Sequence, residues 1–231
     1  MSTIDSAAHT DRSAEVDPFY QALRVSLRPL DYKTDSGRLL GHYSIVGLTS
    51  AAAFSANAVL AALRWADPDK LCVIRQIRAF FYVATAITAQ RLDPLTLSVA
   101  RGYTVRDATN ATTVSLAASS SQKLRSTMGI SLLQNSNGGN IDVASAAAGL
   151  SGGTKVVDSS PIGFMALSDG ASIAGLGTGK SGIVYDSKDA GAHPIVLQQN
   201  EGILLSHGAT AVATGTAIAG IAIDWAEVDG F

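Results

Sequence analysis

The sequence has few charges, few aromatic side chains and a single cysteine. Of its 231 residues, 16% are charged and 6% are aromatic, and 17 Lys and Arg nearly balance 19 Asp and Glu. A net charge of −2 does not favour binding to nucleic acid or to an acidic membrane surface. The hydrophobic share is nevertheless 47%, and it comes mainly from small side chains. We therefore expect apolar surface that another subunit covers.

The single cysteine and the lack of long apolar runs exclude several classes of protein. Cys72 alone cannot form an intrachain disulfide or a metal site with several cysteine ligands. Its neighbours in residues 71–74 are apolar, so we expect a buried thiol. No stretch has the roughly 18 uninterrupted apolar residues of a membrane-spanning helix, and residues 1–18 lack the apolar centre of a signal peptide. These absences predict a soluble protein that is made in the cytoplasm.

The chain divides into two parts by composition. Residues 1–37 are polar and mixed in charge, which predicts a flexible, extended N-terminal arm. In residues 38–231, short apolar runs alternate with Gly, Asp, Asn and Ser, a pattern typical of strands and turns. A body of this length is within the size of one sandwich or barrel. The expected fold is mainly β: an antiparallel β-sandwich that follows the arm.

Period-two alternation marks the strands of this body. It is clearest in residues 95–105, where the apolar positions are Leu95, Leu97, Val99, Tyr103 and Val105. A strand near the C-terminus is expected to bury Ala219, Ile221, Ile223 and Trp225. Residues 71–83 and 195–205 are also rich in strand formers, but Arg75 and residues 198–202 interrupt them. We expect bulges or a tight turn at these interruptions.

Two segments are harder to interpret. In residues 50–66 the apolar side chains fit helical and strand spacing equally well; alanine favours a helix and the neighbouring strands favour a strand, which we prefer. Residues 119–182 are dominated by Ser, Gly, Ala and Asn, which indicates surface loops that join short strands.

Residues 175–181 imitate a phosphate-binding loop, because they end in Gly179, Lys180 and Ser181. The complete pattern requires a glycine at the position of Ala174 and a helix after the loop, whereas residues 182–186 have the pattern of a strand. We expect a glycine-rich hairpin that binds no nucleotide.

The other polar residues form no recognisable catalytic or metal-binding pattern. The histidines have no second ligand type at metal spacing: His9, His42, His193 and His207. Most of the acidic residues are adjacent to Pro, Gly or Ser, as in turns: Asp67, Asp69, Asp93, Asp107, Asp158, Asp169, Asp186 and Asp189. A glycosidase would need two of them facing each other across a cleft. Neither catalytic residues nor a cofactor are assigned, and we expect that the protein is not an enzyme.

Several segments resemble a group of tailed-bacteriophage virion proteins. These segments are residues 64–67 (RWAD), 70–74 (KLCVI), 123–126 (KLRS), 193–197 (HPIVL), 200–203 (NEGI) and 224–228 (DWAEV). The similarity runs from about residue 37 to the C-terminus. The group is similar in character to jelly-roll capsid decoration, or cement, proteins, which lie on the outside of a head shell and bridge neighbouring major capsid subunits. The resemblance implies a jelly-roll-like sandwich and brings no catalytic residues.

The resemblance also implies partners and a location. The expected partners are the major capsid protein or other virion subunits, and not nucleic acid or a membrane. The protein is expected to form a homo-oligomer, with a trimer favoured. The protein would be located in the virion after synthesis in the host cytoplasm. The N-terminal arm is unmatched, but its apolar residues among charges suggest an anchor that orders on a partner: Phe19, Tyr20, Leu23, Val25 and Leu27.

The alternative is a host-recognition or carbohydrate-binding module of the phage tail, and an enzyme is the third possibility. A sugar-binding module would need exposed aromatic residues, for which Trp65 and Trp225 are the candidates. Burial of both tryptophans would favour the capsid protein over the tail module.

Overall fold

A computed structural model describes most of the chain after residue 40. The described residues are three short strands before residue 25 and then residues 41–87, 91–116, 123, 129–134, 139–169, 179–188, 194–212 and 214–228. The chain divides into two compact units, Met1–Asp31 and Tyr32–Phe231, whereas the composition of the sequence places the boundary after residue 37. In the first unit β1 (Ile4–Asp5), β2 (Ser13–Val16) and β3 (Leu23–Arg24) pair in the order β1-β2-β3.

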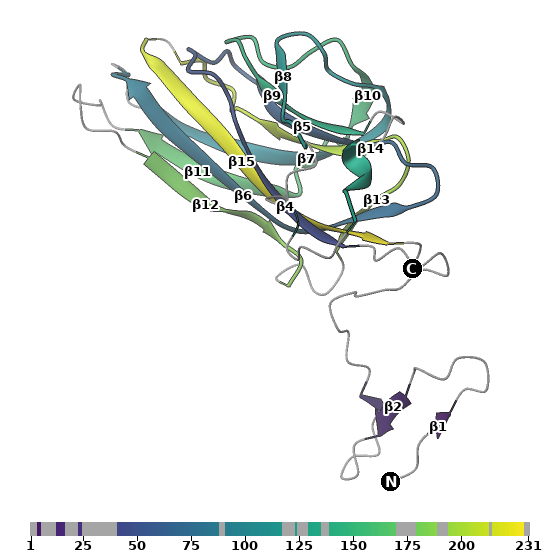
Figure 1. Ribbon diagram of the computed structural model, residues 1–231. Coiled ribbons are helices and arrows are strands. Elements are labelled where there is room, and N and C mark those ends of the chain that lie inside the picture. The colour runs from purple at the N-terminus through teal and green to yellow at the C-terminus, as the bar shows by residue number, and fades with distance from the viewer. Residues whose placement is uncertain are drawn as a thin grey trace. The chain divides into compact units, whose positions relative to one another are not determined.

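The second unit is a sandwich of two antiparallel sheets, which Figure 1 shows as stacked layers. The seven-stranded sheet has the order β10-β7-β14-β5-β9-β8, and β11 also pairs with β7. Its strands are β5 (Val59–Trp65), β7 (Arg91–Val105), β8 (Ala111–Thr113), β9 (Asn140–Ala144), β10 (Thr154–Val157), β11 (Gly163–Asp169) and β14 (Glu201–Ser206).

The five-stranded sheet has the order β12-β6-β15-β4, and β13 also pairs with β6. Its strands are β4 (His42–Leu48), β6 (Leu71–Thr85), β12 (Gly179–Asp186), β13 (Ile195–Leu197) and β15 (Thr216–Val228). A short 3₁₀ turn, η2 (Leu132–Gln134), lies between β8 and β9 in the chain. The predicted mainly β, antiparallel sandwich is therefore confirmed. Among the described residues, no helix is long and apolar enough to cross a membrane.

The strand order is that of a jelly roll. Strands β4, β5, β6 and β7 alternate between the two sheets, and β12, β14 and β15 alternate again after the insertion of β8 to β11. In each sheet a late strand lies between two early ones: β15 between β4 and β6, and β14 between β5 and β7. This interleaving of the two halves of the chain is the double Greek key of jelly rolls. The jelly-roll-like expectation is thus also confirmed.

The core lies between the sheets and follows the predicted alternation. On β15 the four predicted positions from Ala219 to Trp225 are all buried. On β7, Leu95, Leu97, Val99 and Tyr103 are buried, but the prediction for Val105 is wrong, since that side chain is 51% exposed. Val105 is the last residue of β7 and follows an irregular stretch, in which Gly102 has a φ of 57° and the pairing with β10 shifts between Thr154 and Val156. A bulge disrupts the ladder locally, and the side chain at the end of this strand is exposed.

The interrupted segments also behave as expected. Trp225 pairs with Ile74 and Asp224 pairs with Gln76, so Arg75 is the extra residue of a β-bulge. Between β13 and β14 the chain turns tightly, with a positive φ of 61° at Asn200. Residues 59–65 of the ambiguous segment form strand β5, which confirms the preferred interpretation for that part.

Candidate functional site

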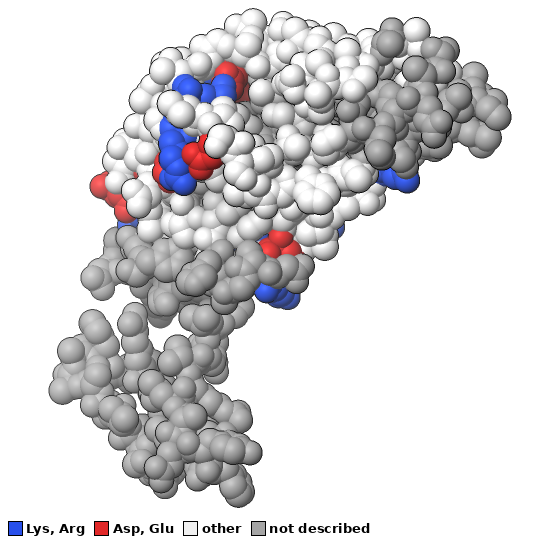
Figure 2. All heavy atoms as spheres, turned by 180° about the vertical axis from the view of Figure 1, so that it is seen from behind, with Lys and Arg blue, Asp and Glu red and all other residues white. Residues whose placement is uncertain are grey.

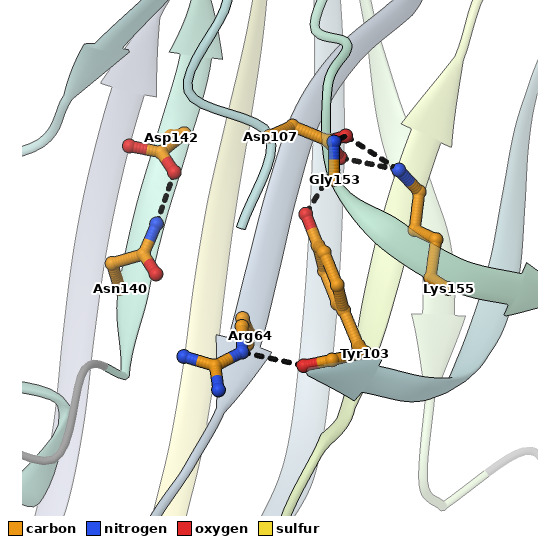
Figure 3. Close-up of polar contacts among 7 residues, drawn as sticks. All are labelled: Arg64, Tyr103, Asp107, Asn140, Asp142, Gly153 and Lys155. Carbon is orange, nitrogen blue, oxygen red and sulfur yellow. Dashed lines mark hydrogen bonds and ion pairs between the residues drawn. The ribbon is translucent and has the colours of Figure 1, made fainter. Parts of the chain in front are cut away.

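The most prominent polar cluster surrounds the buried carboxylate of Asp107, just after β7 (Figure 3). The Tyr103 hydroxyl donates a hydrogen bond to Oδ2 at 2.6 Å, and the Gly153 amide donates to Oδ1 at 2.9 Å. The Lys155 ammonium group on β10 lies 2.6 Å from each of the two oxygens. We call these four residues the Asp107 cluster. Together they supply donors to both oxygens of the carboxylate.

Backbone geometry puts these groups together. The left-handed conformation of Gly102 turns β7, and the Tyr103 amide then donates to the carbonyl of Asn200 at 2.7 Å. A Cβ atom at Gly153 would lie 2.5 Å from Oδ1 of Asp107, so only glycine allows the close approach of this amide. Lys155 Nζ also lies 5.0 Å from the centre of the Tyr103 ring, within the range of a cation–π contact.

The electrostatics of the cluster favour an ionised Asp107 and a neutral Tyr103. Burial alone would raise the pKa of Asp107, but the hydrogen bonds from Lys155 and Tyr103 outweigh it, and the pKa is lowered. Burial and the hydrogen bond to Asp107 raise the pKa of the Tyr103 hydroxyl. The tyrosine therefore keeps its proton and acts as a hydrogen-bond donor to the carboxylate.

A second buried carboxylate, Asp142 on β9, belongs to the same region (Figure 3). It accepts hydrogen bonds from Thr113 Oγ1 at 2.7 Å and from the Asn140 side-chain amide, and the Arg106 guanidinium lies 3.8 Å away. Burial raises the pKa of Asp142, and the negative charge of Asp107 raises it further. Its hydrogen bonds and Arg106 oppose this shift.

Sequence reasoning missed both carboxylates. The sequence pattern predicts a turn position for Asp107, which is instead the centre of a buried cluster, and it indicates no role for Asp142. The available signal was the position of Asp142 between Ile141 and Val143, because an acidic residue inside an apolar strand requires a partner.

The chemistry of these carboxylates is structural. A general base or a glycosidase carboxylate needs a free oxygen that faces a substrate. The oxygens of Asp107 and Asp142 instead accept hydrogen bonds from donors of the chain itself. Two surface pockets in the described part of the chain are lined by residues other than Asp107 and Asp142. One of about 410 Å³ is lined by residues 68–71 with Gln198 and Gln199, and one of about 210 Å³ is lined by Tyr43, Arg75, Gln76, residues 186–188, Asp224 and Trp225.

A third buried carboxyl group, that of Glu227, lies near the end of β15 and is 2% exposed. Ser131 Oγ donates to Oε1 at 2.6 Å, and Trp225 Nε1 donates to the same oxygen at 3.1 Å. The Leu132 amide lies 3.1 Å and 3.0 Å from the two oxygens. Burial raises the pKa of Glu227 to about 7, with a smaller contribution from the charge of Asp67. Glu227 thus joins residues 131 and 132 to the end of the sandwich.

The two tryptophans are both fully buried. Trp65 donates its indole hydrogen to the carbonyl of Lys70 at 2.8 Å, and Trp225 stacks on Tyr43 with 5.5 Å between ring centres. A buried indole has no face available for a sugar ring. Both residues are therefore core residues of the sandwich.

The predictions for Cys72 and for the turn at Asp67 are confirmed. Of the other acidic residues predicted in turns, Asp93, Asp169 and Asp186 lie in strands β7, β11 and β12. Cys72 is buried, and burial raises the pKa of its thiol. Oδ1 of Asp67 accepts hydrogen bonds from the amides of Asp69 and Lys70, both at 2.9 Å, as an aspartate in a turn does. In the described part of the chain, no group of three or more His, Cys, Asp or Glu side chains is arranged to hold a metal ion.

The remaining predicted positions are only partly described. The strand predicted over residues 182–186 is part of β12, which begins earlier than predicted, at Gly179, and residues 171–178 lie outside the described residues. His42 contacts Arg75, His207 is buried, and His9 and His193 lie outside the described residues. Of the arm anchor, Leu23 belongs to β3, whereas the others lie outside the described residues: Phe19, Tyr20, Val25 and Leu27.

Comparisons of the chain with protein-family models, with curated proteins and with solved structures find no match.

Proposed function

We propose that the protein is a non-enzymatic structural protein of a tailed-bacteriophage virion, and specifically a capsid decoration (cement) protein that binds and stabilises the head shell. The segments that resemble phage virion proteins and the jelly-roll strand order support this assignment. The observation that carries the choice is the burial of both Trp65 and Trp225. It leaves neither tryptophan available at the surface for the alternative, a carbohydrate-binding tail module.

The surface has the composition of a protein that binds other proteins. Figure 2 shows a face on which most described atoms belong to uncharged residues, with Lys and Arg beside Asp and Glu in a few small groups. Large apolar side chains are exposed on both sheets: Val46, Leu48, Tyr82, Val105, Val156, Val157, Ile162, Phe164 and Ile183. Exposed apolar groups in such numbers are typical of surfaces that a partner covers.

The buried carboxylates support a structural role over an enzymatic one. The oxygens of Asp107 are held by Tyr103, Gly153 and Lys155, and those of Glu227 by Ser131, Leu132 and Trp225. Networks of this kind join separate strands and loops of the sandwich and resist unfolding. A protein that stiffens a shell needs this rigidity and does not need an accessible base.

The proposed partners are the major capsid protein or another virion subunit, together with further copies of this chain. The protein acts in the virion after synthesis in the host cytoplasm, without nucleic acid or membrane as a partner. The apolar residues at positions 19–27 provide an additional contact with such a partner.

Electron cryo-microscopy of purified phage particles tests this proposal. We expect the jelly-roll body at repeated positions on the outer surface of the head, in contact with the major capsid protein. A complementary assay adds the purified protein to capsids that lack it and measures occupancy and the temperature of shell disruption. Density at the tail tip, with binding to host glycans, would support the tail module instead, and absence from the particle would contradict both.

A further inference from the structure

The outer face of the five-stranded sheet carries rows of side chains that run across its four main strands. The strand register defines three consecutive rows: Ile183, Arg78, Ala222 and Val46; Ser181, Phe80, Gly220 and Leu48; and Gly179, Tyr82 and Ile218. Val46, Leu48, Tyr82 and Ile183 are each about half exposed, at 45–56%. We call these three rows the apolar face. Arg78 is its one charged residue.

Small residues leave room for a large ring near the centre of the apolar face. Gly220 and Ala222 of the central strand β15 are both buried, and the Phe80 ring occupies the space that a side chain at Gly220 would take. The half-exposed side chains of the neighbouring strands surround these positions. The outer face of a sheet that carries apolar side chains can pack against another sheet, as sheets do in sandwiches.

The size of this face fits a weak, reversible contact between two copies. Three rows about 6.6 Å apart, crossing four strands about 4.8 Å apart, cover roughly 400 Å². Two such faces together bury about 800 Å², an area typical of weak and transient protein interfaces. The apolar rows alone are close to the largest patch of an ordinary monomer.

The distribution of charge favours a copy of the same chain as the occupant. A two-fold contact brings like surface to like surface, which is favourable for apolar rows and unfavourable for a face with many charges of one sign. A two-fold axis along the row of Phe80 and Gly220 would place Arg78 of one copy over Tyr82 of the other. The single charge of the apolar face would then meet an aromatic ring in a cation–π contact.

We propose that the apolar face packs against the same face of a second copy of this chain. This inference deepens the self-association that is part of the proposed function, and names the surface that carries it. A contact of one face with itself has two-fold symmetry. It therefore predicts a dimer, in place of the trimer that the resemblance favours.

Sedimentation velocity of the full-length protein over a wide concentration range tests the inference. We expect a reversible dimer, and Leu48→Glu should raise the dimer dissociation constant by roughly 100-fold or more, because each dimer would bury two unpaired carboxylates. The matched control is Val156→Glu, which adds the same charge at an exposed position, 71% accessible, of edge strand β10 on the seven-stranded sheet. The control should dimerise like the wild type.

Each outcome of this experiment supports or contradicts the proposed contact. Circular dichroism establishes that each variant is folded, and if Leu48→Glu is not, Ile183→Glu on strand β12 replaces it. A monomeric or trimeric wild type, or a dimer that neither variant weakens, would overturn the inference. A monomer whose binding to capsids is lost in Leu48→Glu would identify a capsid subunit as the occupant and would also overturn it. A dimer that the variants weaken but that does not bind capsids would support this contact and contradict the proposed function.

Discussion

Replacement of Glu227 by glutamine should change how the stability of the protein depends on pH. In the folded protein the pKa of Glu227 is about 7, compared with the ordinary value of 4.5, because the carboxyl group is buried. The folded state therefore retains this proton at pH values at which the unfolded chain has lost it. By linkage, the contribution of Glu227 to stability is greatest below pH 4.5, falls between pH 4.5 and about 7, and is constant above that range.

The size of the effect follows from the shift. The rise of the pKa of Glu227 from 4.5 to about 7 corresponds to about 3 kcal/mol between the two ends of this range. Glutamine has nearly the same shape and stays neutral, and its amide oxygen can accept the hydrogen bonds from Ser131, Leu132 and Trp225. We expect Glu227→Gln to be more stable relative to the wild type at pH 8 than at pH 5, by up to this amount.

Urea unfolding at several pH values between 5 and 8 measures this difference. The titrations of Asp107 and Asp142 are common to both proteins, so they cancel when the variant is compared with the wild type at each pH. Glu201→Gln is the matched control, since it removes an acidic side chain whose ion pair with Arg101 involves a largely exposed guanidinium group. If the stability difference between Glu227→Gln and the wild type stays constant over this range, the reasoning from burial is refuted.

Three further predictions concern other parts of the chain. Lys155→Met should lower the free energy of unfolding by about 3 kcal/mol in urea titrations, because it leaves the Asp107 carboxylate buried without its cation. A loss below about 1 kcal/mol would mean that the ion pair of Lys155 and Asp107 stabilises the protein no more than a surface salt bridge does. Calorimetry with ATP and GTP should detect no nucleotide binding by residues 175–182. Micromolar affinity for either nucleotide, lost in Lys180→Ala, would contradict this prediction. Deletion of residues 1–30 should leave the circular dichroism of the body unchanged and lower its occupancy on capsids, and unchanged occupancy would exclude a role for the arm in attachment.

The strands could be predicted from the sequence where one face of a strand is buried and the other is not. On β7, Leu95, Leu97 and Val99 are buried, and they alternate with the partly exposed Thr96 and Ser98. Strand β5 gave no such signal, since Leu60, Ala61, Ala62 and Leu63 are consecutive and all buried. Both faces of this central strand are covered, which removes the period-two pattern and explains why residues 50–66 fitted a helix equally well.

The buried polar clusters could not be predicted, because their members are distant in the sequence. Lys155 is 48 residues from Asp107, and Asp142 is 29 residues from Thr113. The approach of Lys155 depends on the pairing of β10 with the bulged end of β7 and on the absence of a side chain at Gly153. Neither the register shift nor this close approach leaves a local pattern, so Asp107 looked like an ordinary turn residue.

The burial of acidic side chains connects the composition of the chain to the proposed assembly. Asp107, Asp142 and Glu227 are each at most 2% exposed, so three of the 19 acidic residues contribute little to the charge of the surface. In addition, the raised pKa of Glu227 leaves part of this group uncharged near neutral pH. The surface is therefore closer to electrical neutrality than the formal net charge of −2 suggests. Copies of such a protein repel one another weakly, and the exposed Val46, Leu48 and Tyr82 side chains then favour association.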